Sequence, residues 1–551
     1  MKCTKTNFKF NMKWNNIDWK EKEIWLYNLQ CKIFKLTKIN DINTVFFIQK
    51  QIINHSYAKL LAVRKITQDN LGKRTAGVDN ISVLTPNERM KLSHKVCINN
   101  QSDKIRRVTI LKPNGKERHL GIPTIRDRVK QCLVKFALEP QYEASFEPNS
   151  YGFRPGRSSN DARQAIVNCL QLLPKYVLDA DIKGCFDNIC HDKLLEKLRT
   201  FPLLKSQIEV WLKAGILLNF QGNKTETHST SGTPQGGIIS PLLANIALDG
   251  LERKVSKRGV YLVRYADDFL VLCNEEKELF KAKLKIENFL EDLGLELSKE
   301  KTKITHTKFI SKSKNGIDFL GFNFVNYKVG KYKSTKNNQG KFTGWKSRCQ
   351  PSLKAVNDHL TNIKYIIKRS KGISQKVLIC KLAPVISGWT RYFSVCSATK
   401  AFSYCSFRTF YFLKKWASRR TKPGSSIKKY WIPLGASERV FALIEKNKVI
   451  KLQRHNQTKI ILSTKVAGIS STYDGRIAYW AKRLSSNNKY GQLLRKLLKV
   501  KGPRCNWCQL YFQDSDKIEI DHIIPKNQKG TSEWGNLRLL HRHCHDTRHS
   551  K

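Results

Sequence analysis

Two adjacent acids, Asp267 and Asp268, stand in the middle of an otherwise apolar and β-branched run at residues 261–272, YLVRYADDFLVL. Apolar residues on both sides of a short polar centre predict a strand, a tight turn and a returning strand. Two carboxylates at the tip of such a hairpin repel each other unless the turn is solvated or a divalent cation binds there. The run therefore predicts a solvated polar turn or a metal site, and the rest of the chain decides between them.

A second acidic centre occurs at residues 176–187, YVLDADIKGCFD. Alternation places Asp179 and Asp181 on one side of a strand that ends at a glycine turn, which is a common position for a site residue and also for a helix cap. Asp181 together with Asp267 and Asp268 can hold two magnesium ions about 4 Å apart. Magnesium prefers hard oxygen ligands, and such a pair of ions would activate a 3′-hydroxyl and stabilise a leaving pyrophosphate.

The charge of the chain restricts its partners. The 551 residues include 101 Lys and Arg against 44 Asp and Glu, a net charge of +57. The mutual repulsion of these positive charges is relieved when a polyanion binds, most commonly the phosphate backbone of a nucleic acid. Between Asp318 and Glu438 a single acid, Asp358, accompanies 24 Lys and Arg interleaved with aromatics, which predicts a nucleic-acid surface. A membrane partner is not expected, because no apolar run approaches the length of a spanning helix.

Three other stretches carry structural signals. Residues 18–70 have the apolar spacing of helices. Residues 106–123 contain a Pro-Asn-Gly turn, which predicts a hairpin with Lys112 and Arg118 on either side. Residues 318–324, DFLGFNF, predict one short buried strand.

The 15 cysteines are mostly single and irregularly spaced, which favours a reducing compartment over a disulfide framework. The first residues lack the apolar core of a signal peptide, and Lys, Ile and Asn are abundant throughout. These features favour an organelle-encoded product (chloroplast or mitochondrion), with a bacterial cytoplasmic protein as the alternative.

From residue 64 to residue 551 the order of motifs resembles the reverse transcriptases encoded by group II introns. The resemblance implies a multidomain α+β fold: right-hand polymerase fingers and palm, an α-helical thumb or maturase domain, and a C-terminal ββα-metal HNH module. The implied domains are an N-terminal helical extension (1–60), fingers and palm (61–340), thumb and maturase domain (341–440), a DNA-binding region (441–497) and the HNH module (498–551).

The resemblance also implies roles for single residues. Asp181, Asp267 and Asp268 become the catalytic magnesium ligands. Lys112 and Arg118 become clamps for a substrate triphosphate, and Gln235, in residues 233–241, belongs to the nucleotide pocket. Phe186 lies where reverse transcriptases carry an aromatic ring that would clash with a ribose 2′-hydroxyl and so select deoxynucleotides. Its other interpretation is an ordinary core aromatic.

The last fifty residues resemble an HNH endonuclease, through CxxC at 505–508, Asp-His at 521–522, Asn536 and HRHCH at 541–545. The resemblance implies a structural zinc site, for which we expect these ligands: Cys505, Cys508, Cys544 and His541, with His543 as the alternative fourth ligand.

The same resemblance makes His522 the general base that activates water. Asp521 and His545 are expected to hold a catalytic divalent ion, commonly magnesium, while Asn536 helps to ligate that ion or orients its loop. His549 has a weaker claim as a site residue. The alternative is a zinc-ribbon DNA binder without cleavage.

These parts form one pathway. Residues 378–393 resemble the maturase domain and residues 471–480 the adjoining DNA-binding segment. We expect the chain to bind its group II intron RNA, promote splicing and nick one strand of a double-stranded DNA target. It would then extend the freed 3′-hydroxyl with dNTPs on the RNA template, and a homodimer is left open. The alternative function is a splicing maturase with little or no polymerase or nuclease activity; a retron-like polymerase is disfavoured by the maturase-like and HNH-like ends.

Overall fold

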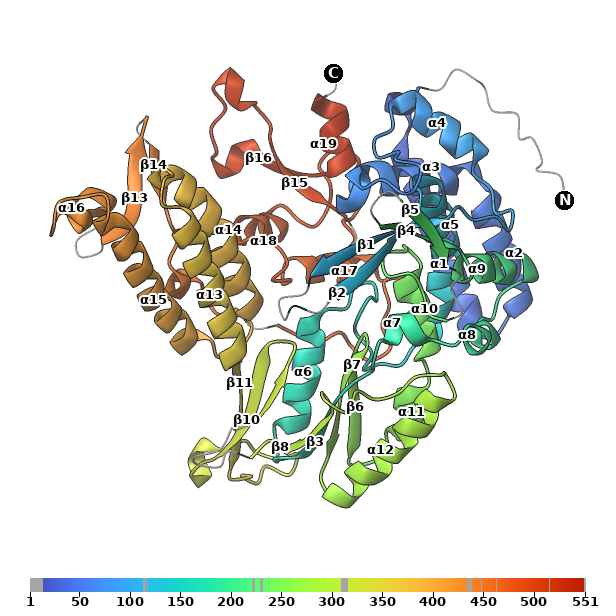
Figure 1. The fold of residues 1–551 in the computed structure, drawn as a ribbon, viewed down its shortest axis with the longest axis horizontal. Helices are drawn as coiled ribbons and strands as arrows, with labels where there is room; N and C mark the ends of the chain where they lie inside the picture. Colours follow the sequence, from blue (N-terminus) through green and yellow to red (C-terminus); the bar gives the residue numbers. More distant parts are fainter. Residues whose placement is uncertain are drawn as a thin grey trace.

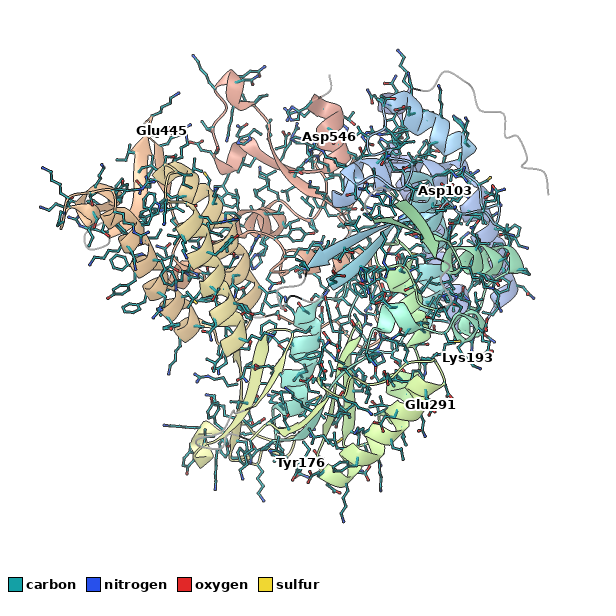
Figure 2. All side chains as sticks on the ribbon, viewed as in Figure 1. Asp103, Tyr176, Lys193, Glu291, Glu445 and Asp546 are labelled. Carbon is teal, nitrogen blue, oxygen red and sulfur yellow. The ribbon has the colours of Figure 1, made fainter. Side chains whose placement is uncertain are left out.

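The structure is a computed structural model, which describes residues 13–111, 115, 117–220, 223–227, 231–308, 316–433, 439–446, 448–461, 463–514 and 516–549. Figure 1 shows the N-terminal helices and the helices of residues 353–430 on opposite sides, with the sheet that carries Asp181 below and the C-terminal module above. In the view of Figure 2, Tyr176 at the start of β3 (Tyr176–Asp181) lies near the bottom and Asp546 of α19 (Arg542–His549) near the top. Within these described residues, every helix is too short or too polar to serve as a membrane span.

The N-terminal region is helical, as its apolar spacing predicts. It contains α1 (Trp19–Lys38), α2 (Ile42–Asn54) and α3 (Ser56–Arg64), which pack against one another and against α5 (Ile125–Ser145). Asp18 caps α1 by accepting a hydrogen bond from the Lys20 N–H. The short helices that follow are η2 (Lys65–Asp69), η3 (Leu71–Arg74) and α4 (Pro86–Lys95).

The region that the resemblance assigns to the fingers contains a four-stranded sheet in the order β2-β1-β4-β5. Its strands are β1 (Ile105–Leu111), β2 (Glu117–Ile122), β4 (Ile216–Phe220) and β5 (Asn223–Thr227). The antiparallel pair β1 and β2 is the hairpin expected at residues 106–123, with Arg118 opposite Ile110. Lys112 lies outside the described residues.

A second four-stranded sheet, which we call the palm sheet because the resemblance assigns it to the palm, has the order β6-β7-β3-β8. Its strands are β3 (Tyr176–Asp181), β6 (Val260–Tyr265), β7 (Asp268–Cys273) and β8 (Lys303–His306). Alternate residues of β7 enter two different cores, one shared with α12 (Glu276–Glu291) and one with α6 (Ser159–Leu170). Helices therefore cover both faces of this sheet. The hairpin expected at residues 261–272 is present.

The remaining helices of the palm region are short. They are α7 (Cys185–Asn188), α8 (His191–Lys197), α9 (Pro202–Leu212), α10 (Ser240–Ala247) and α11 (Leu251–Val255).

Residues 318–324 correct one expectation. They form a hairpin of β9 (Ile317–Phe319) and β10 (Phe322–Lys328), and β10 also pairs with β11 (Trp345–Pro351). Leu320 and Gly321 turn the chain with φ of 50° and 77°, as in a two-residue turn with two left-handed residues. The prediction of one strand was wrong because leucine seldom occupies a left-handed position and so gave no turn signal.

The region that the resemblance assigns to the thumb consists of α13 (Leu353–Arg369), α14 (Gln375–Phe393) and α15 (Thr399–Ser418). A small appendage follows, with α16 (Ser426–Tyr430), β12 (Trp431–Pro433), β13 (Arg439–Glu445) and β14 (Lys448–Lys451). Trp416 lies in the core that joins these helices to the appendage.

The segment after the appendage is fastened to the palm region. Arg157 donates hydrogen bonds to the carbonyls of Gly468 and Ser470, and the Tyr473 hydroxyl donates to Glu139 at 2.8 Å. Next come α17 (Ile477–Leu484) and α18 (Gln492–Val500), and then β15 (Ile518–His522), β16 (Leu537–His541) and α19, of which β15 and β16 pair antiparallel.

Candidate active sites and metal centres

The palm sheet brings three acids to one end. Because β3 and β7 are antiparallel neighbours in this register, Asp181 lies directly opposite Asp268. Asp267 occupies the two-residue turn between β6 and β7. Burial, followed by the neighbouring carboxylates of Asp181 and Asp267, raises the pKa of Asp268 to about 7, and burial also raises the pKa of Asp267. A group of acids with raised pKa values suits a divalent cation, whose charge favours their ionised forms.

Lys301 supplies positive charge at this site. Its ammonium donates to Asp181 at 2.5 Å, and the contact raises the pKa of Lys301. Sequence reasoning gave this lysine no role, because it is one of several lysines in a surface-like stretch and lies 120 residues from Asp181.

Buried polar groups hold the acidic turn in place. Ala266 has a φ of 60°, a left-handed conformation that is unusual for alanine. The Arg264 guanidinium, 1% exposed, donates to the Ala266 carbonyl at 3.1 Å and to the Asn245 side chain at 3.0 Å. Asn245 in turn donates to the Gly152 carbonyl at 2.9 Å. Gly152 is packed so closely that a Cβ there would lie 2.2 Å from the Ala266 nitrogen.

A hydrogen-bonded chain links the fingers to the palm beside these acids. Arg118 donates to the Gln235 side-chain oxygen at 3.1 Å, and the Gln235 amide donates to the Asp187 carboxylate at 3.0 and 3.1 Å. Phe186 is half-buried and makes an edge contact with Phe153, with ring centroids 6.0 Å apart. The structure therefore brings Arg118 and Gln235 together, whereas sequence reasoning missed Asp187.

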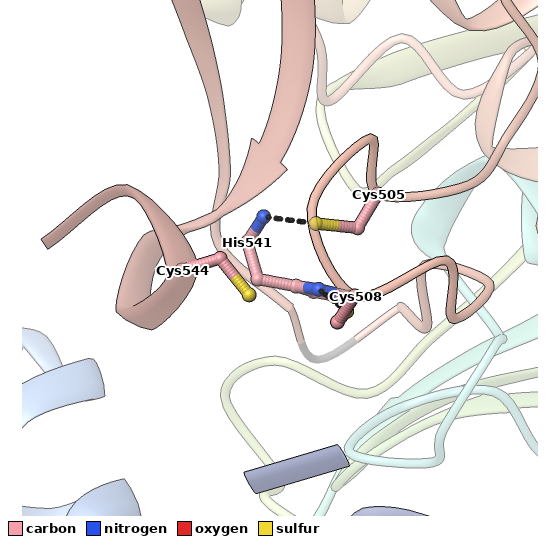
Figure 3. Close-up of side chains that lie close together, drawn as sticks. All are labelled: Cys505, Cys508, His541 and Cys544. Carbon is pink, nitrogen blue, oxygen red and sulfur yellow. Dashed lines mark hydrogen bonds between the residues drawn. The ribbon is translucent and has the colours of Figure 1, made fainter. Parts of the chain in front are cut away.

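Among the described residues, two groups of His, Cys and Asp side chains that could hold a metal ion have all their ligand atoms within 4.8 Å of one another, and both lie in the C-terminal module. The first comprises Cys505, Cys508, His541 and Cys544, whose ligand atoms all lie within 4.8 Å of one another. Figure 3 shows two cysteines from the loop before β15 facing His541 at the end of β16 and Cys544 of α19. Three sulfurs and one imidazole nitrogen form the soft donor set of a structural zinc site.

The two candidate histidines point to different partners. His541 directs Nδ1 to Cys508 Sγ at 3.4 Å, while its Nε2 lies 3.3 Å from the Asp516 carboxylate. A carboxylate on the second ring nitrogen is the usual support for a metal-bound histidine. His543 instead lies 3.8 Å from Glu23 of α1. The geometry therefore places His541, and not His543, with the three cysteines.

The second group comprises Asp521, His545 and His549, again within 4.8 Å. Two arginines hold Asp521: Arg538, its partner across the strand pair, donates at 2.8 Å, and Arg548 also donates to it. His545 and His549 are one helical turn apart on α19, a spacing that could have marked His549 as a stronger candidate.

His522 and Asn536 flank this second group. His522 is half-buried at the end of β15, with Nε2 3.3 Å from the Ser532 hydroxyl. The Asn536 amide accepts from the Ile524 N–H at 2.7 Å and donates to the Ile524 and Thr531 carbonyls. Of the two roles expected for Asn536, the structure thus shows contacts that hold the loop and does not bring the side chain into the ligand group.

Comparisons with known proteins match four family models. They are the N-terminal domain of reverse transcriptase at residues 14–96, reverse transcriptase (RNA-dependent DNA polymerase) at 110–324, the group II intron maturase-specific domain at 356–432 and HNH endonuclease at 505–551. Reverse transcriptase and HNH families generally use divalent metals, and the reverse transcriptase and maturase domains imply binding to intron RNA and other nucleic acids.

Relatives occur in both eukaryotes and bacteria. Maturase-like protein 1 of Euglena gracilis is 28% identical over 416 residues, which cover 73% of this chain and 81% of the relative. The group II intron-encoded protein LtrA of Lactococcus lactis subsp. cremoris is 36% identical over 274 residues, 37% of this chain and 45% of the relative. A solved structure of apo telomerase from Candida tropicalis, truncated from the C-terminal domain, covers 40% of this chain and 53% of its own at 18% identity, and its TM-score of 0.31 is too low to support an argument.

The candidate sites lie inside the regions that the family models match. The acids of the palm lie within the reverse transcriptase match, and both ligand groups lie within the HNH match. Four family models in this order along one chain identify it as a member of the group II intron-encoded proteins, which join an RNA-directed DNA polymerase, a splicing maturase and an HNH DNA endonuclease.

Proposed function

We propose that this protein inserts its intron by target-primed reverse transcription. The HNH module nicks one strand of a double-stranded DNA target, and the palm extends the new 3′-hydroxyl with dNTPs on the bound intron RNA. The observation that carries the proposal is the placement of Asp181 opposite Asp268, with Asp267 in the adjoining turn. We also propose that the chain is divided at the domain boundaries expected from the sequence and that it is encoded in an organelle.

In the palm, Asp181, Asp267 and Asp268 would hold two magnesium ions. When bound, these ions supply the positive charge that favours ionisation of the primer hydroxyl and offsets the charge of the departing pyrophosphate. Buried Arg264 keeps the acidic turn in position through its bond to the Ala266 carbonyl. Preorganisation of this kind matters because small displacements of catalytic groups are costly in rate.

The nucleotide would bind beside the acids. Arg118 and Lys112 would contact the triphosphate, and Gln235 would help to line the pocket. The contact between Arg118 and Gln235 supports this assignment, because it holds the guanidinium against the palm. Phe186 would exclude a 2′-hydroxyl and so select deoxynucleotides.

In the HNH module, His522 would take a proton from the attacking water. Asp521, His545 and His549 would hold a divalent ion, taken to be magnesium, against the scissile phosphate, and Asn536 would fix the loop between the strands. The closeness of these three ligands supports this set over one that includes Asn536.

The zinc site would serve the fold of the same module. We assign zinc to Cys505, Cys508, His541 and Cys544, whose donors fit a tetrahedral structural site. Zinc would join the loop before β15 to α19, the helix that carries two of the divalent-ion ligands.

The proposal is tested by cDNA synthesis on a primed RNA template with dNTPs and magnesium. Asp268→Ala should reduce synthesis to background while RNA binding and DNA nicking are retained. Glu291→Ala is the matched control, because Glu291 is an exposed acid at the end of α12. Undiminished synthesis by Asp268→Ala would overturn the palm assignment. A wild-type protein that promotes splicing but neither polymerises nor nicks would favour the splicing-only alternative.

A further inference from the structure

The outward face of α15 in the thumb is aromatic. Tyr404, Phe407 and Tyr411 are 47%, 56% and 51% exposed, respectively. Their spacing of three and four residues places them on one side of the helix. The opposite side is buried and carries Phe402, Cys405, Thr409, Leu413 and Trp416. The core of the thumb therefore already has its own set of side chains, and the three exposed rings are not needed to fill it.

Such a face is unusual for a surface helix, whose outward side is normally polar. The charged residues beside it are basic: Arg408, Lys414 and Lys415 are all exposed. No acid occurs anywhere in α15. A single acid accompanies the 24 Lys and Arg between Asp318 and Glu438, so this surface carries one sign of charge.

The exposed rings of α15 do not stack face to face on one another. Phe407 and Tyr411 meet edge to face, with centroids 4.7 Å apart and planes at 63°. Arg408 lies over Phe412, 5.7 Å from its centroid, which keeps a guanidinium beside the row of rings. Planar aromatic surfaces separated by cations match a ligand that alternates planar groups with negative charges.

We propose that the outward face of α15 binds unpaired bases of RNA, which stack on Tyr404, Phe407 and Tyr411 while the neighbouring cations contact the phosphates. Unpaired bases are required because an A-form duplex keeps its base faces inside the stack. RNA is the chosen occupant because α15 lies within residues 356–432, which match the maturase-specific domain. The inference rests on the proposed function, since it specifies where and in which form the chain holds its RNA.

The test uses the full chain and a short unpaired RNA that contains 2-aminopurine, whose fluorescence is quenched when the base stacks. Alanine at all three rings should weaken binding of this RNA by at least about 100-fold, since each stacked ring contributes about 5- to 150-fold. The quenching should disappear, while the slope of binding against salt is unchanged because no cation has been removed. Exchanging Tyr and Phe at the three positions should preserve affinity.

Two control measurements separate stacking from other effects. Phe280→Ala removes a ring that is 53% exposed on α12 in the palm and should leave RNA affinity unchanged. Replacing Lys414 and Lys415 with alanine should lower the salt slope by about 0.7 for each phosphate that the variant no longer neutralises. The same RNA annealed to its complement should bind the wild type and the triple variant equally.

The inference is overturned if the triple variant binds unpaired RNA like the wild type, or loses paired and unpaired RNA equally. It is also overturned if the variant loses only single-stranded DNA binding, or only self-association. Failure of the wider proposal looks different. In that case the wild type fails to bind both the unpaired and the paired RNA, or fails to extend a primer. A failure limited to α15 leaves RNA binding and primer extension by the wild type intact.

Discussion

Replacing Gly152 with alanine tests whether close packing positions the acidic turn that carries Asp267. A Cβ at this residue would lie 2.2 Å from the Ala266 nitrogen and 2.9 Å from its Cα and Cβ. The backbone of Gly152 is outside the left-handed region, so alanine is conformationally tolerated there. The substitution therefore acts through space, against the residue that immediately precedes Asp267.

The size of the effect follows from that distance. An ordinary contact begins near 3.4 Å, so the turn and residue 152 must separate by about 1 Å. A displacement of about 1 Å at a catalytic group can lower the rate about 100-fold. Overpacking also costs about 1–3 kcal/mol of unfolding free energy, which a chain of this size can tolerate. We therefore expect a folded protein with a polymerisation rate about 100-fold below wild type.

The assay is single-turnover extension of a primed RNA template, with thermal unfolding measured on the same preparation. DNA nicking is an internal control, because the HNH module is a separate site and should remain active. Gly330→Ala is the matched variant, since a Cβ there meets nothing within 4 Å. A Gly152→Ala protein that polymerises within about threefold of wild type would refute the reasoning from close packing.

Other perturbations separate the two active sites and the thumb. His522→Ala should lower nicking of a DNA duplex by about 100-fold or more, with cDNA synthesis unchanged; equal losses in both assays would contradict a role as base. Cys544→Ser should lower the amount of bound zinc, measured by metal analysis. It should abolish DNA nicking while cDNA synthesis is retained. Burial lowers the pKa of His359 to about 4 and, with the charge of His359, that of His455 to about 3, while their Nε2 atoms lie 2.8 Å apart. Because the unfolded chain binds these protons near pH 6.5, stability should fall between pH 6 and 4.5 by about 2.7 kcal/mol per pH unit. Urea unfolding should show this slope in the wild type and lose it when both histidines are glutamine.

Patterns within a few neighbouring residues of the sequence correctly predicted the hairpin of β6 and β7. The apolar run around Asp267 and Asp268 predicts both strands, since alternation and turn residues act over a few positions. The prediction of a single strand at residues 318–324 was wrong because it also relied on local signals. Leu320 adopts a left-handed conformation at the turn, and a leucine does not signal one.

Contacts between distant segments could not be predicted in this way. The ion pair of Lys301 with Asp181 joins residues 120 positions apart in sequence, and the contact of Asp187 with Gln235 joins residues 48 positions apart. Pairings of this kind depend on how strands and loops assemble, and no local periodicity records them. These contacts place a positive charge and an amide beside the acids, whereas the acids themselves can be recognised from the sequence.

The sequence alone determined which reactive groups this chain carries: the acids Asp181, Asp267 and Asp268, an aromatic ring at Phe186 and a Cys/His-rich C-terminal module. Only the tertiary structure decided how those groups meet. The antiparallel register of β3 and β7 sets Asp181 against Asp268. The strand end and helical turn at the C-terminus direct His541 to the cysteines, His543 to Glu23, and His549 to Asp521. The physical reason is that residue type is fixed by the chain, whereas the direction of each side chain is fixed by the packing of elements around it.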